Sequence, residues 1–263
     1  MDATAVRPAA VAGMFYPADP AALRAQLDAL LSVAGASADK APKLLVVPHA
    51  GYVYSGPIAA RAYATLAPWR EQITRVVMLG PAHRVPVASL AAPAAGAFET
   101  PLGRVEIDAQ ALQKVADLRQ VVRDDRPHAF EHSLEVQLPF LQVTLAHFTL
   151  APLVVGAAHA DAVAQVLERL WGGDETLIVI SSDLSHYLAH AQAQARDRRT
   201  IARMVAFDAA LEPDDACGAH AINGALVAAR RHGLAPRVLD VRNSGDTAGD
   251  RRGVVGYAAV AFS

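Results

Sequence analysis

The sequence predicts an α/β fold in which helices cover both faces of a central β-sheet. Short aliphatic runs alternate along the chain with segments of helical periodicity. The aliphatic runs show little period-two alternation, which is typical of strands that are buried on both faces. Hydrophobic residues make up 53% of the 263 residues, and we find no convincing linker. We therefore expect a single domain over residues 1–263 with one large core.

The elements of the first half follow from apolar periodicity and capping residues. A helix is expected over residues 18–31, where Asp19 suits the cap and Pro20 suits the first helical position. The elements predicted after it are a strand at 43–47, a helix at 57–69, strands at 75–80 and 86–92, a hairpin at 98–108 and a helix at 108–118.

The second half continues the alternation. Leucines at 134, 138, 141 and 145 share one face of a predicted helix over 132–145, which Pro139 is expected to kink. The remaining predicted elements are strands at 148–156 and 176–183, helices at about 160–171 and 188–207, a helix that begins near Cys217, and strands at 237–245 and 253–263.

Composition narrows the class of protein. A net charge of -2 argues against a nucleic-acid-binding surface, which needs a basic stripe. The single cysteine excludes an internal disulfide and suits a reducing compartment. The first residues lack the pattern of a signal peptide, and no apolar stretch reaches the ~18 residues of a membrane span. We therefore expect a cytoplasmic protein that binds neither nucleic acid nor a membrane.

Residues that can bind metal or move protons follow three of the predicted buried strands. His49 follows "LLVVP", His83 follows "VVMLGPA", and Asp183 and His186 end "LIVISSDLSH". Ligands of open α/β sheets bind beyond the carboxyl ends of strands. If these strands are neighbours, the four side chains converge at one rim of the sheet. Taken singly, each histidine could instead be a hydrogen-bonded loop residue.

Two further segments suggest a pocket. Cys217 lies where a helix is expected to start, and a helix N-terminus lowers the pKa of a thiol and favours metal-binding thiolate. A small buried hydrophobic residue is the alternative for Cys217. In "PHAGYVYSG", Gly51 and Gly56 could form tight turns that turn the phenols of Tyr52 and Tyr54 toward a pocket, unless both rings simply pack.

A competing motif lies at residues 128–132. "HAFEH" has the inverzincin form, in which two histidines bind zinc and the glutamate activates water. The match is short, and no acidic ligand follows it in a clear helical context. We therefore do not expect a protease.

Seven segments together resemble one known family. The chain is similar over nearly its whole length to the Memo family, whose bacterial and archaeal members are labelled AmmeMemoRadiSam system protein B. This resemblance implies a fold like that of the class III extradiol dioxygenases, with a mixed central sheet flanked by helices. The segments, in order, are "AVAGMFYPADP", "PHAGYVYSG", "GPAHR", "EHSLEVQLPFL", "SSDLSHY", "CGAHAINGAL" and "GYAAVAF".

The resemblance also implies roles for individual residues. His49 and His83 match the two imidazole ligands of the metal, and Cys217 matches a thiolate that replaces the dioxygenase carboxylate. His186 matches the acid/base of the dioxygenases, and Asp183 matches an acidic residue that lines the pocket. The resemblance to the dioxygenases implies Fe(II) as the metal. Copper and zinc are alternatives, because imidazole and thiolate suit several transition metals.

The same resemblance bears on the middle of the chain and on function. The shared part there is "EHSLE", so Glu131 and His132 are expected to bind substrate or orient a ligand, and Tyr54 to contact substrate. The expected function is a metal-dependent, dioxygenase-like redox enzyme that acts on an unknown small molecule. The alternatives are a non-catalytic adaptor that binds metal or peptides, and a partner of a radical-SAM protein.

Overall fold

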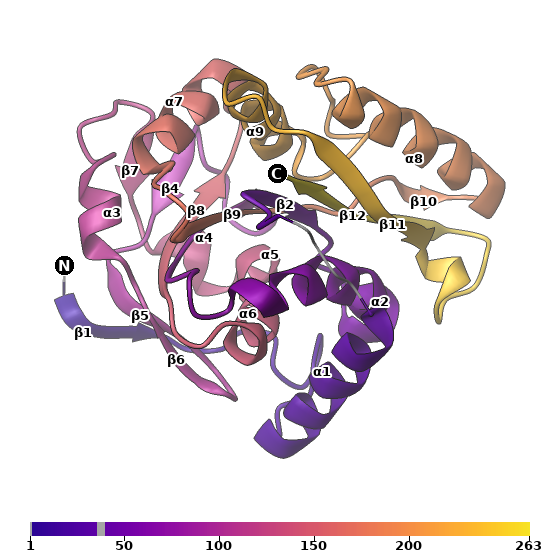
Figure 1. Cartoon of the computed structure of the whole chain (residues 1–263), viewed down its shortest axis with the longest axis horizontal. Coiled ribbons are helices and arrows are strands. Elements are labelled where there is room, and N and C mark those ends of the chain that lie inside the picture. The colour runs from indigo at the N-terminus through magenta and orange to yellow at the C-terminus, as the bar shows by residue number, and fades with distance from the viewer. Residues whose placement is uncertain (1, 36–39) are drawn as a thin grey trace.

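The computed structural model describes residues 2–35 and 40–263 and contains a large β-sheet with helices on both faces (Figure 1). Among these residues the large sheet has nine strands. They are β2 (Leu44–Val47), β3 (Arg75–Pro81), β4 (Leu90–Ala92), β7 (Val121–Arg123), β8 (Thr149–Val155), β9 (Thr176–Ser181), β10 (His186–Leu188), β11 (Pro236–Asn243) and β12 (Val254–Phe262).

The sheet is mixed, with a parallel centre. Its order is β10-β12-β2-β9-β3-β8-β4-β7, and β11 pairs with β12. Strands β2, β9, β3 and β8 run parallel, whereas β12 and β4 join this centre antiparallel. The four parallel strands are almost wholly buried, which explains their continuous aliphatic sequences. The predicted fold class is therefore confirmed.

Helices form a layer on each face of the large sheet (Figure 1). They are α1 (Pro20–Ala34), α2 (Tyr52–Tyr63), α3 (Ala109–Gln113), α4 (Arg126–Ala129), α5 (His132–Glu135), α6 (Leu138–Thr144), α7 (Ala160–Leu170), α8 (His190–Val205) and α9 (Ala219–Arg231). Helices α1, α2, α5 and α6 pack together on one face, and α7, α8 and α9 cover the other.

A second, three-stranded sheet lies beside the large one. It contains β1 (Asp2–Arg7), which was not predicted, and the predicted hairpin of β5 (Ala95–Thr100) and β6 (Gly103–Glu106). Gly103 has a φ of 116°, so the hairpin turn requires glycine. Arg7, at the end of β1, forms a buried ion pair with Glu135 of α5. This pair fixes the N-terminal segment against the helix that begins at His132.

Prolines and glycines account for two differences from the expected elements. The predicted helix over 132–145 is broken rather than kinked, because Pro139 has no N–H to donate to the carbonyl of Glu135 and instead lies in the first turn of α6. The turn expected at the tyrosines is instead the first turn of α2, and the chain continues after Tyr63 as a 3-10 helix. Gly51 caps α2 with a negative φ, so it forms no left-handed turn.

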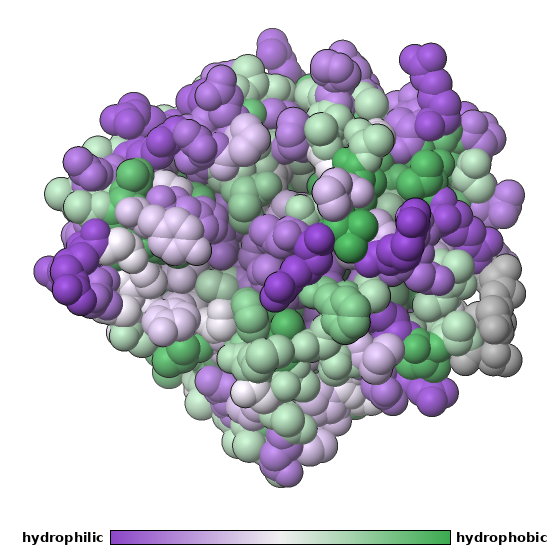
Figure 2. Space-filling view, turned by 180° about the vertical axis from the view of Figure 1, so that it is seen from behind, coloured by the Kyte–Doolittle hydropathy of each residue, from purple (hydrophilic) through white to green (hydrophobic). Residues whose placement is uncertain are grey.

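Several short elements also differ from the prediction. The strand expected at 86–92 is limited to β4, and the helix expected at 108–118 is limited to α3, although Asp108 does cap it. No helix in the described part of the chain is long and apolar enough to span a membrane. On the face shown in Figure 2, strongly hydrophobic side chains occur in small separate groups among hydrophilic ones. Such scattered residues do not by themselves indicate a docking surface.

Candidate metal centre

The predicted convergence of strand ends occurs. Strand β9 lies between β2 and β3, and all three run parallel, so the residues after them meet at one edge. His49 follows β2, Asp183 follows β9 and His83 follows β3. The backbone N–H of His49 donates to Asp183 Oδ1 at 2.8 Å, and the rings of His49 and His83 have centroids 5.2 Å apart. The edge of the sheet therefore gathers two imidazoles and a carboxyl group.

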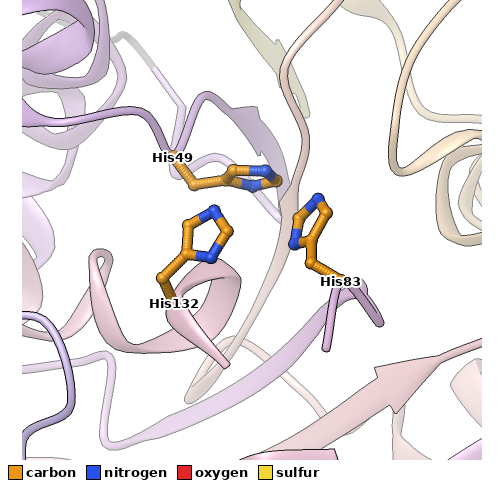
Figure 3. A group of neighbouring side chains, drawn as sticks. All are labelled: His49, His83 and His132. Carbon is orange, nitrogen blue, oxygen red and sulfur yellow. The ribbon is translucent and has the colours of Figure 1, made fainter. Parts of the chain in front are cut away.

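His132 completes a group of three imidazoles (Figure 3). One nitrogen from each of His49, His83 and His132 lies within 4.8 Å of the others. The ring of His132, at the start of α5, is 4.6 Å from that of His83 and nearly parallel to it, and 5.3 Å from that of His49. Sequence reasoning placed His132 at the substrate, whereas its position also suits a third metal donor. The signal in the sequence was its place in "EHSLE", which does not distinguish the two roles.

Glu131 fixes the proton of His83. Its Oε1 lies 2.9 Å from His83 Nδ1, and its Oε2 accepts from the His83 backbone N–H at 2.6 Å. Burial opposes ionisation, but the hydrogen bonds from His83 and Ser133, and the charge that His83 carries when protonated, lower the pKa of Glu131 to about 2. An ionised carboxylate only accepts, so a neutral His83 ring carries its proton on Nδ1 and presents the Nε2 lone pair.

The other two histidines are suited to metal binding by burial. Burial, and then the neighbouring imidazoles, hold the pKa of His49 well below its ordinary value. Burial also lowers the pKa of His132 to about 4. Among the described residues, Nδ1 of His132 has no hydrogen-bond partner, since its 3.3 Å contact with Glu131 Oε1 lacks hydrogen-bond geometry. Two neutral imidazoles beside a third, with one nitrogen of each within 4.8 Å of the others, fit a transition-metal ion.

Cys217 lies beside Nε2 of His49. Its Sγ is 3.3 Å from His49 Nε2 and accepts a hydrogen bond from the Asp183 backbone N–H at 3.3 Å. The expected lowering of its pKa is wrong, because burial, followed by the charge of Asp183, raises the pKa of the thiol to about 12. Cys217 precedes Gly218, the cap of α9, and nearby backbone N–H groups do not offset burial. Cys217 stands beside the three-histidine group rather than within it.

The remaining predicted residues lie outside the three-histidine group. Asp183 is buried, and burial raises its pKa to about 7 despite the hydrogen bond from His49. His186 begins β10, and burial lowers its pKa. Tyr54 lies in the first turn of α2, with 39% of its surface exposed.

A cavity of about 380 Å³ opens onto the site. Its walls come from the β3–β4 loop at residues 81–87, the turn at 155–157, Pro213, Cys217 and His220. Sequence reasoning missed this loop as a wall, because residues 86–92 were expected to form a strand. Because His83 and Cys217 both line this cavity, a small ligand in it would lie beside both side chains.

The inverzincin motif does not form a metal site. Helix α4 ends at Ala129 and α5 begins at His132, so the two histidines of "HAFEH" do not share a helix face. His128 is buried, contacts the carbonyl of Ala91 through Nε2 at 3.0 Å and packs against Phe98. His128 therefore packs in the core and does not belong to the three-histidine group.

Comparison with known proteins identifies the family. A family model described as Memo-like protein matches residues 7–261. The chain belongs to the Memo family. Three similar relatives are proteins named MEMO1 family protein, and the Memo family predicted from the motifs is confirmed. They come from Sulfolobus acidocaldarius (35% identical, over 98% of this chain and 99% of the relative), Methanopyrus kandleri (38%, over 97% and 98%) and Aquifex aeolicus (37%, over 98% and 99%).

Proposed function

We propose that this Memo-family chain binds a transition-metal ion at His49, His83 and His132 and uses it in a redox reaction on a small molecule. The observation that carries this proposal is the approach of three imidazole nitrogens to within 4.8 Å of one another. Cys217 is a fourth donor in this proposal, because its Sγ lies 3.3 Å from His49 Nε2. A metal-bound thiol loses its proton even where burial has raised its pKa.

The donor set suits Fe(II), copper and zinc, and the proposed dioxygenase-like reaction makes Fe(II) the first choice, with copper or zinc as alternatives. Imidazole nitrogens suit all three metals, and a thiolate adds preference for soft ions. When bound, such an ion supplies a Lewis acid and, if it is iron or copper, a centre for electron transfer. A dioxygenase-like reaction further requires coordination positions that the protein does not fill.

The surrounding side chains suit substrate binding and proton transfer. The cavity beside His83 and Cys217 holds the substrate in this proposal, a small phenolic or carbonyl compound. Asp183 and His186 move protons, and the pKa of about 7 that burial gives Asp183 lets this carboxyl group hold or release a proton near neutral pH. Arg84, in the loop that walls the cavity, brings a positive charge to its mouth.

Nitric oxide tests whether an open coordination position exists. Metal-free protein is loaded with Fe(II) without oxygen, exposed to nitric oxide and examined by electron paramagnetic resonance. We expect a signal from an iron–nitric oxide complex in the wild type and in His128→Gln, whose histidine lies outside the site, and its loss in His83→Ala. Fully iron-loaded wild type that gives no such signal would contradict the redox proposal and favour a protein that binds metal without catalysis.

A further inference from the structure

We propose that Ser181 is a positioning residue that holds the proton of His49 on Nδ1 and so presents its Nε2 lone pair to the metal. The side chains of Ser181 and its neighbour Gln137 are fully buried, as is Tyr63, which contacts Gln137. They belong to a hydrogen-bonded chain that ends at two backbone carbonyl oxygens. A carbonyl oxygen only accepts, so these two ends fix the direction of every hydrogen bond between them.

The first end is the carbonyl of Pro48. Gln137 Nε2 donates to it at 2.9 Å and to Ser181 Oγ at 2.8 Å. Because Pro48 cannot donate, the amide nitrogen rather than the oxygen must face it. The amide oxygen Oε1 then accepts from the Tyr63 hydroxyl at 2.8 Å. The orientation of Gln137 is thus determined, and Ser181 Oγ receives a hydrogen bond from it.

The second end is the carbonyl of Ser133. Ser181 Oγ donates to it at 2.5 Å, which uses the single proton of the hydroxyl group. His49 Nδ1 lies 2.9 Å from the same Oγ. With its proton directed at Ser133, the hydroxyl can only accept from His49. Nδ1 therefore carries the proton of the neutral imidazole, and Nε2 carries the lone pair.

His49 therefore adopts the same tautomer as His83, but its Nδ1 partner is the uncharged Ser181 hydroxyl, whereas that of His83 is the Glu131 carboxylate. Glu131 is itself buried, and its charge is stabilised by the hydrogen bonds that it accepts from the backbone N–H groups of His83 and Ser133. The Ser181 hydroxyl orients His49 without placing a second charge in the buried site. Two chemically different neighbours thus present two Nε2 atoms to one site.

The tautomer can be measured in metal-free protein. The protein is labelled with nitrogen isotope in histidine, treated with chelator and examined by long-range proton–nitrogen correlation, with His49→Asn used to assign the ring. We expect His49 to carry its proton on Nδ1. In Ser181→Ala the acceptor is lost, and we expect the proton to shift toward Nε2, where Cys217 Sγ can accept it. Gln137→Met removes only the donor to Ser181, so the hydroxyl proton still goes to the Ser133 carbonyl and His49 should keep its proton on Nδ1.

The consequence for metal affinity rests on the proposed function. We expect the dissociation constant for Zn²⁺, measured by titration calorimetry, to rise roughly 10–100-fold in Ser181→Ala. Ser181→Thr, which keeps the hydroxyl group, should restore both the tautomer and the affinity. Ser55→Ala is the matched control, because Ser55 is also buried but donates to the carbonyl of Ala50. It should change neither property.

Two results would overturn the inference: a wild-type His49 protonated on Nε2, or an unchanged Nδ1–H tautomer in folded Ser181→Ala. Circular dichroism establishes that the variant is folded, and the wild-type tautomer tests the inference even if the variant does not fold. If the tautomer shifts as expected but the wild type binds no metal, the role of Ser181 stands and the proposed function fails.

Discussion

At the scale of single residues, burial determines the charge of several histidines. Burial is the main reason why the pKa values of His49, His128 and His132 are lowered. For the two histidines in the metal group this favours the neutral ring that a metal requires. His128 is also buried but lies outside the metal group. A substitution there therefore measures how a neutral buried imidazole affects the free energy of unfolding, without disturbing the metal ligands.

His128→Gln should make the folded state less sensitive to acid. The pKa of His128 is lowered from 6.5 to about 4, so between these pH values the unfolded chain binds a proton that the folded chain does not. Stability contributed by the neutral ring is therefore lost as pH falls from about 6.5 toward 4, at up to about 1.4 kcal/mol per pH unit. Urea unfolding of metal-free protein at several pH values measures this slope. An equal slope in wild type and variant would contradict the assignment.

The candidate ligands were partly predictable at this scale. His49 and His83 stand directly after strongly aliphatic strands, so their place at the sheet edge follows from local sequence. Ser181 and Gln137 have no such signal in the sequence. Gln137 donates to the carbonyl of Pro48, and Ser181 donates to the carbonyl of Ser133. In each pair the two residues are far apart along the chain. The pKa of Cys217 was predicted in the wrong direction, because local sequence shows a helix start but not the burial of the thiol.

At the scale of elements, the β3–β4 loop is held in place by the end of β8. Gly156 donates from its backbone N–H to the carbonyl of Ser89 at 2.7 Å. A Cβ at Gly156 would lie 1.7 Å from the carbonyl oxygen of Val87, which is backbone and cannot move without the loop. This loop carries His83 and walls the cavity, so its position affects both the metal group and substrate entry.

Gly156→Ala should therefore weaken metal binding without touching a ligand. Displacement of the loop moves His83 away from the other imidazoles, and we expect roughly a tenfold or greater loss of Zn²⁺ affinity by calorimetry. Gly253→Ala is a suitable control, since the nearest atom to its added Cβ is at 3.8 Å. Unchanged affinity in folded Gly156→Ala would show that the loop does not position His83.

Long, periodic elements were the ones that sequence could predict. Helices α1, α7 and α8 and the four parallel strands have clear patterns of their own. Strands β7 and β10 have three residues each, which is too short for a pattern, and they are defined by pairing with β4 and β12. The break at Pro139 was expected as a kink, because the sequence shows the missing N–H but not how far the chain reorients.

At the scale of the whole molecule, strand order creates the site. His49 and Asp183 are 134 positions apart in the chain, yet adjacent pairing of β2 and β9 brings them into hydrogen-bonding contact. The parallel direction of three neighbouring strands then places His49, Asp183 and His83 at a common edge. Sequence can indicate that strands end in such residues, but the order of strands in the sheet is a property of the assembled fold.

Metal content tests the central claim most directly. Protein purified without oxygen and reloaded with Fe(II) is analysed by elemental mass spectrometry, with His128→Gln as the control that retains metal. The account predicts about one metal ion per chain in the wild type. It also predicts loss of the metal in His83→Ala and in His132→Ala, and weakened retention in Cys217→Ser. Wild type that stays empty would contradict the metal site, and a full complement in His132→Ala would contradict the three-histidine ligand set.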